Sequence, residues 1–176
     1  MILSKYQYNQ ILPAVDEINL SITNFKKGLG VAGQRLEALH KAGFHIECLI
    51  INGQLIENSI KMILRSHYLR RQILKALNLP DFSVGVDLGD YQEQTLGFLI
   101  KKLKLFTGQS PLIVKLWNFK NQYRDEFIHR IFGGGKDIGQ IDIEADNFLR
   151  TEEFRGIILE LSEINLQLKA EIESLY

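Results

Sequence analysis

Apolar residues recur every three or four positions along almost all of this 176-residue chain, and this helical period constrains the fold more than any other feature. The C-terminal stretch shows it most clearly, with apolar residues at Phe154, Ile157, Leu161, Ile164, Leu168, Ile172 and Leu175. No segment has the sustained apolar–polar alternation, bounded by hairpin turns, that is typical of a β-strand. We therefore expect an all-α protein.

Glycine and proline divide the pattern into about five helices. The first ends at the glycines of residues 28–33, the second at Leu79-Pro80, and either Gly43 or Gly53 can interrupt the second. The third opens with an Asp90/Glu93 capping box, and the fourth starts at Ser110-Pro111. We expect loops over residues 81–90 and 133–147.

Short connections favour antiparallel neighbours, so these helices should form an up-and-down bundle. The length fits one domain, residues 1–176. Residues 1–33 are expected to be an extra N-terminal helix with its glycine-rich break, and residues 34–176 the bundle core.

The single cysteine, Cys48, cannot form an internal disulfide and reads as a small buried hydrophobe. The N-terminal residues lack the apolar stretch and cleavage site of a signal peptide. No run approaches the roughly 18 apolar residues of a membrane span. These features predict a cytoplasmic protein without a membrane partner.

Two glycine motifs fail on context. The sequence GLGVAG, residues 28–33, matches the dinucleotide-binding fingerprint, but helical patterns flank it where strands are required. The run Gly133–Lys136 lacks the other residues of a phosphate loop. His40 and His45 are five apart, and no cysteine or second histidine cluster completes a ligand set. We therefore expect no cofactor and no metal.

One stretch of the fourth expected helix groups residues suited to phosphodiester chemistry. Asp125 and His129 are four apart, so the carboxylate can hold one ring nitrogen and favour the charged imidazole. Arg124 lies five positions before His129, about 140° around an ideal α-helix, yet its long side chain can reach the same groove. A guanidinium stabilises charge on phosphate oxygens while an imidazole moves protons. The same residues also fit an ordinary solvated face with ion pairs such as Glu126–Arg130.

The net charge of zero argues against a general polyanion binder, but the charges are unevenly distributed along the chain. Residues 61–136 carry 13 basic and six acidic side chains, and residues 137–176 carry three basic and ten acidic ones. The first segment is therefore +7 and the second −7. This distribution predicts an anionic ligand near the fourth helix, with the acidic last helix facing away from it or meeting a basic partner.

The sequence R-D-E-F-I-H at residues 124–129 resembles the R-x(4–6)-H signature of the HEPN superfamily, in which Asn, Asp or His usually follows the arginine. The stretches ECLIINGQLIENSIKMIL and QTLGFLIKKLKLF precede it, as helices do in that family, and the resemblance covers about residues 43–175. It implies an all-α bundle with the motif near the end of the penultimate helix, and a homodimer in which two motif helices face one another. For active members it implies metal-independent RNA cleavage.

In such a reaction the RNA supplies its own nucleophile, the 2′-hydroxyl, so the protein must provide a general base, a general acid and charge stabilisation. We assign His129 to acid–base chemistry and Arg124 to the developing phosphorane charge. Asp125 orients His129 or pairs with an arginine across the dimer. A symmetric dimer brings both copies of His129 into one cleft.

The expected function is therefore a ribonuclease, of toxin or defence type, that contacts RNA through Lys120, Asn121 and Arg130. The resemblance also allows a partner, either an antitoxin or a nucleotidyltransferase that modifies Tyr123. The favoured interpretation of Tyr123 is that it belongs to the apolar stripe of its helix. The alternative function is a non-catalytic helical module that dimerises or binds a nucleotide or a protein.

Overall fold

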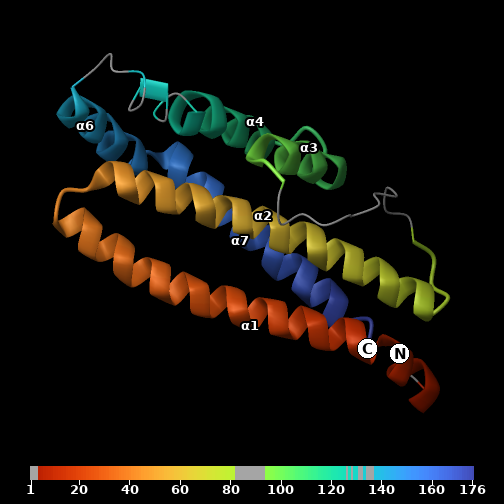
Figure 1. Ribbon diagram of the computed structural model, residues 1–176. Helices are drawn as coiled ribbons and strands as arrows, with labels where there is room; N and C mark the ends of the chain where they lie inside the picture. Colours follow the sequence, from red (N-terminus) through yellow and green to blue (C-terminus); the bar gives the residue numbers. More distant parts are fainter. Residues whose placement is uncertain (1–3, 82–93, 126, 128, 131–132, 134–136) are drawn as a thin grey trace.

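The computed structural model describes residues 4–81, 94–125, 127, 129–130, 133 and 137–176. Every regular element within these ranges is helical, which confirms the all-α prediction (Figure 1). They contain six α-helices and one π-helix, against about five helices expected. The elements are α1 (Lys5–Lys41), α2 (His45–Ala76), α3 (Leu96–Thr107), α4 (Pro111–Asn118), the π-helix η1 (Phe119–Asp125), α6 (Ile138–Leu149) and α7 (Glu152–Glu173).

The N-terminal helix α1 is continuous, so the predicted break at Gly28, Gly30 and Gly33 is wrong. All three glycines are exposed, and a Cβ on any of them has nothing within 4 Å. An exposed glycine costs a helix only about 1 kcal/mol relative to alanine, and the rest of α1 offsets that cost. The chain turns at Gly43 instead, whose φ of +78° lies in the left-handed region. Residues 34–41 therefore continue α1, and the expected division at residue 33 falls inside a helix.

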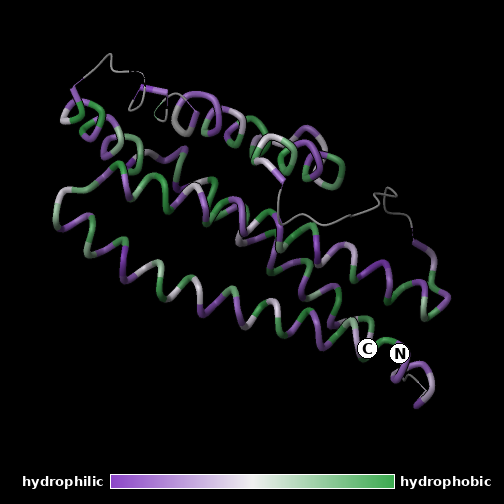
Figure 2. Tube along the Cα trace, in the orientation of Figure 1, coloured by the Kyte–Doolittle hydropathy of each residue, from purple (hydrophilic) through white to green (hydrophobic). Residues whose placement is uncertain are grey.

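Buried side chains form two clusters, and α2 and α7 contribute to both. The smaller cluster joins α1 to the C-terminal halves of α2 and α7 through Ile11, Val15, Ile18, Leu69, Ile73, Leu77, Leu168 and Ile172. The larger one lies among α2, α3, α4, α6 and α7 and includes Phe119, Phe148 and Phe154, whose rings contact one another. Figure 2 shows apolar and polar positions mixed along α1 and α2, as expected of helices that bury one face.

The helices α3 and α4 have identifiable ends. Thr95 caps α3, accepting the N–H of Phe98 at 3.4 Å, and Gly108 with φ +67° ends it. The predicted start of α4 at Ser110-Pro111 is confirmed. The Asp90/Glu93 capping box lies outside the described residues.

The predicted loop over residues 133–147 is wrong from residue 138 onward, where α6 begins. Asp137 begins this helix by accepting the N–H of Gly139 at 3.2 Å. Its buried stripe is short, Ile141, Ala145 and Phe148, and one of the three positions is a small residue. Such a stripe is a weak sequence signal among acidic residues. The predicted last helix is confirmed as α7.

Candidate functional site

The segment Arg124–His129, called the motif segment below, begins in a wider turn than the α-helix predicted for it. η1 continues directly from α4 and contains Arg124 and Asp125. In a π-helix each N–H bonds to the carbonyl five residues back, so residues five apart share a face. The wider turn allows both Phe119 and Phe127 to point into the core. Both side chains are buried, and the two residues are eight positions apart. On an α-helix those two positions lie about 80° apart, and one π-turn removes most of that difference.

Lys120 and Asp125 show the effect of this geometry. Lys120 Nζ lies 2.5 Å from Asp125 Oδ2, a pair of residues five apart. The same ammonium donates to Asn121 Oδ1 at 3.3 Å and lies 5.8 Å from the centre of the Trp117 ring. The predicted catalytic and RNA-contacting residues Asp125, Lys120 and Asn121 therefore lie together. The carboxylate contact of Asp125 is with Lys120, and its orientation of His129 stays a prediction.

His129 is exposed beyond η1, at the end of the motif segment. Its carbonyl oxygen accepts the N–H of Gly133 at 2.7 Å, which closes the turn. A Cβ on Gly133 would lie 2.6 Å from that oxygen, so this turn requires glycine. The backbone of Arg124 belongs to η1, and its side chain lies outside the described part of the structure, as do residues 126 and 128.

Arg130 is placed differently from the other predicted RNA contacts. Its side chain is only 15% exposed, and Nη2 lies 2.7 Å from Glu144 Oε2 on α6. The guanidinium also lies 5.3 Å from the centre of the Phe127 ring. Arg130 therefore joins the motif segment to α6, and a phosphate would have to compete with Glu144. Because α6 intervenes, the motif does not lie on the penultimate helix, and that expectation is wrong.

The charge segregation along the sequence is partly compensated in space. Arg70 pairs with Glu171, Lys115 with Glu160 and Arg130 with Glu144, so cations of residues 61–136 are compensated by carboxylates of residues 137–176. Two acidic residues of α7, Glu160 and Glu171, pair with cations of the same chain, and the prediction that the acidic last helix faces away from an anionic ligand or meets a basic partner stays a prediction.

Basic side chains remain exposed on α3 beside the motif segment. Gly97 at the start of α3 packs on Lys120 and Trp117, with Lys120 Cε 3.0 Å from an ideal Cβ on Gly97. Lys101 is one turn beyond Gly97 and therefore lies near the same face, and Lys104 follows one turn later. Both lysines are exposed, so they form a positive surface on α3 beside Lys120, whose own charge is paired with Asp125.

A second polar cluster joins the α1–α2 turn to α6. His40, His45 and Asp146 each offer one ligating atom, and these atoms lie within 4.8 Å of one another. The two histidines were recognisable from the sequence, but Asp146 was not. It is about 100 residues away, on a helix that was expected to be a loop. The spacing of Asp142 and Asp146, one helical turn apart, was the available signal.

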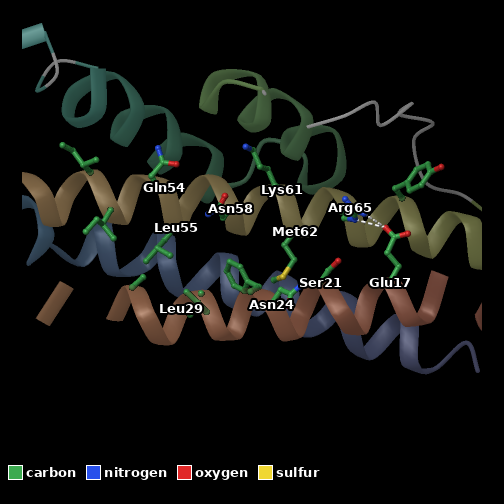
Figure 3. A pocket seen from close by; sticks show the side chains of 16 residues that line it. Glu17, Ser21, Asn24, Leu29, Gln54, Leu55, Asn58, Lys61, Met62 and Arg65 are labelled. Atoms are coloured by element: carbon green, nitrogen blue, oxygen red, sulfur yellow. Dashed lines mark hydrogen bonds and ion pairs between the residues drawn. The ribbon is translucent and has the colours of Figure 1, made fainter. Parts of the chain in front are cut away.

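A groove with a volume of about 860 Å³ lies between α1 and α2 (Figure 3). Leu29, Leu55 and Met62 line its apolar part, and Asn24 and Asn58 supply amides. Arg65 of α2 reaches across to Glu17 of α1, with Nη2 2.7 Å from Oε1. The groove exists because α1 is packed into the core mainly through its N-terminal half.

Within the described ranges, no helix is long and apolar enough to cross a bilayer. Comparisons with models of known protein families, with curated proteins and with solved structures find no match to this chain.

Proposed function

We propose that this chain is a metal-independent endoribonuclease of HEPN type, which cleaves RNA at the Arg124–His129 segment. The observation that carries the proposal is the π-helical turn of η1 followed by an exposed imidazole. On an α-helix the two motif residues are about 140° apart; only the step from Arg124 to Asp125 lies in η1, so the π-turn narrows that angle slightly, and a long arginine side chain spans the rest. π-turns are frequent at functional sites.

The reaction needs no group beyond the RNA and the protein. The 2′-oxygen loses its proton to one imidazole and attacks phosphorus, and the bond from phosphorus to the 5′-oxygen breaks. A second imidazole protonates the departing 5′-oxygen, so the products are a 2′,3′-cyclic phosphate and a 5′-hydroxyl. His129 from each of two chains supplies the base and the acid, and Arg124 stabilises the phosphorane charge.

The exposed Lys101 and Lys104 of α3 support the choice of RNA as substrate, because exposed lysines on one helix face bind a phosphate backbone. In this proposal the protein acts in the cytoplasm as a homodimer joined through its motif helices. It is a toxin or defence effector controlled by an antitoxin or a nucleotidyltransferase.

Incubating the purified chain with varied single-stranded RNAs in the presence of EDTA tests the catalytic part. Wild type should release fragments with a 2′,3′-cyclic phosphate, and His129→Ala and Arg124→Ala should lose at least 100-fold in rate. His40→Ala is the matched control, since it removes a half-exposed histidine outside the motif segment and should cleave normally. Inert wild type, or a fully active His129→Ala, would overturn the proposal.

Salt dependence tests the RNA surface separately from cleavage. In a His129→Ala background, Lys101→Glu and Lys104→Glu should each weaken binding and lower the log–log salt slope by about 0.7 per lost phosphate contact. Lys27→Glu is the control, because Lys27 is an exposed lysine of α1 outside this surface. Equal loss with Lys27→Glu would show that only net charge matters.

The groove favours a second candidate, a non-catalytic dimerisation module. Leu29 and Ile50, which line it, are 39% and 50% exposed. If copies associate there, Ile50→Glu should raise the dimer dissociation constant in sedimentation equilibrium, whereas Val31→Glu, 70% exposed and outside the groove, should not. Dimers that survive Ile50→Glu but dissociate in the Arg124→Ala/His129→Ala variant would instead support association through the motif helix.

A further inference from the structure

Four polar side chains from three helices converge where the α1–α2 turn meets α6. His40 lies in the last turn of α1, and His45 is the first residue of α2. Asp142 and Asp146 lie one turn apart on α6, so they share a face. The left-handed Gly43 reverses the chain between the two histidines and brings their rings to 5.1 Å between centroids.

Asp142 fixes the orientation of His45. Its Oδ1 accepts the backbone N–H groups of His45 at 2.8 Å and Ile46 at 2.9 Å, which caps α2 from a helix distant in sequence. Its Oδ2 lies 2.7 Å from His45 Nδ1. A carboxylate only accepts hydrogen bonds, so Nδ1 carries the hydrogen, and in the neutral ring Nε2 presents its lone pair. Both side chains are largely buried, His45 18% and Asp142 23% exposed.

The lone pair of His45 Nε2 faces a carboxylate oxygen. Nε2 lies 3.6 Å from Asp146 Oδ1, and His40 Nδ1 lies 3.9 Å from the same oxygen. These separations are too long for good hydrogen bonds. They are close to the spacing of ligands around one ion, because bonds of 2.0–2.1 Å in a tetrahedral site place ligand atoms about 3.4 Å apart. A cation placed among these two nitrogens and the carboxylate oxygen would be bound by all three as ligands.

We propose that His40, His45 and Asp146 bind a divalent transition-metal ion of the zinc type. Two imidazole nitrogens and one carboxylate oxygen are a borderline donor set, which suits Zn²⁺, Co²⁺ or Ni²⁺ better than Mg²⁺ or Ca²⁺. Asp142 is the positioning residue, in the carboxylate–histidine–metal arrangement that recurs at zinc sites. His40 is 49% exposed, so one side of the ion is open to water or to a substrate.

Arg150 competes with the metal for Asp146. Its Nε lies 2.9 Å from Asp146 Oδ1, and its side chain is 62% exposed. The exposed guanidinium can move into solvent when the ion enters. This competition provides a variant that should strengthen binding rather than weaken it.

The probe for the site is Co²⁺ added to the full chain after treatment with a chelator. Wild type should develop the visible absorption of low-coordinate cobalt, which Zn²⁺ displaces and Mg²⁺ does not. Asp142→Asn should weaken affinity by about 10–100-fold, as loss of an orienting partner does. His40→Ala and Asp146→Ala should each weaken it at least as much, and Arg150→Ala should strengthen it.

His129→Ala is the matched control, since it removes an exposed histidine outside the cluster and should bind Co²⁺ as wild type does. His40 is half exposed, so its replacement keeps the fold and the test remains decisive. Equal Co²⁺ affinity in wild type and the His40→Ala/Asp146→Ala variant would overturn the metal site. RNA cleavage is measured with EDTA present, so failure of either proposal leaves the other unchanged.

Discussion

His67 of α2 should make the protein less stable as the pH falls. Its ring stacks on Phe106, with centroids 4.3 Å apart and planes at 15°. Burial, helped by the positive charge of Arg70 and opposed by Glu171, lowers the pKa of His67 from 6.5 to about 4. The unfolded chain therefore takes up a proton that the folded chain excludes between these two pH values. Stability from this group is complete above pH 6.5 and declines as the pH falls toward 4.

The magnitude follows from the size of the shift. Each pKa unit corresponds to about 1.4 kcal/mol, so lowering the pH from about 7 to about 4 should remove about 3 kcal/mol through His67. Urea unfolding followed by circular dichroism across that range measures the loss. Carboxylates also titrate there, so the informative quantity is the difference between wild type and a variant that lacks only this proton.

His67→Phe is that variant, because phenylalanine keeps the stack on Phe106 and cannot titrate. It should show a shallower fall in unfolding free energy between pH 7 and 4, by about 3 kcal/mol. Parallel curves for wild type and His67→Phe, or a His67 pKa near 6.5 by NMR titration, would refute the reasoning.

Three further predictions concern unfolding free energies measured by urea denaturation. Gly30→Ala should stabilise by about 1 kcal/mol and Gly43→Ala should destabilise by about as much, because only Gly43 has a positive φ. Phe119→Ala should cost about 3–5 kcal/mol, since the ring is 1% exposed in the larger cluster. Asp142→Ala should cost about 2 kcal/mol and Asp142→Asn less, because the amide oxygen can still accept the N–H groups at the start of α2.

The helical period predicted the fold class and the last helix because both depend on local spacing. Glycine was a less reliable guide, since its effect depends on φ and surroundings that spacing does not contain. Gly30 lies within a helix, and Gly43 turns the chain. A Cβ built on Gly53 would lie 3.6 Å from the ring of Phe119. The α6 helix was missed because Ala145 interrupts its apolar stripe with a small side chain.

In the candidate site, too, some features were predictable from the sequence and others depend on how the helices pack. Residues 119, 123 and 127 follow one another by steps of four, and each step of four exceeds the 3.6 residues of an α-turn. That drift was a readable signal for a wider turn. The contact between Asp146 and the histidines had no such signal, because it requires the placement of α6 against the α1–α2 turn. The charge sums of residues 61–136 and 137–176 were a poor guide to the surface charge for the same reason. Arg70 pairs with Glu171 and Lys115 with Glu160 only after folding.

The π-turn also has a consequence for how this segment can vary in length. Phe119 and Phe127 contact the same core, yet a regular α-helix needs only seven residues to return to that face, about 20° short of two turns. The segment thus holds one residue more than its scaffold requires. Deleting the exposed Asn121 would restore an α-helix and keep both aromatic rings buried. A lineage could therefore gain or lose the surface geometry of the motif through a single-codon insertion or deletion, without rebuilding the bundle.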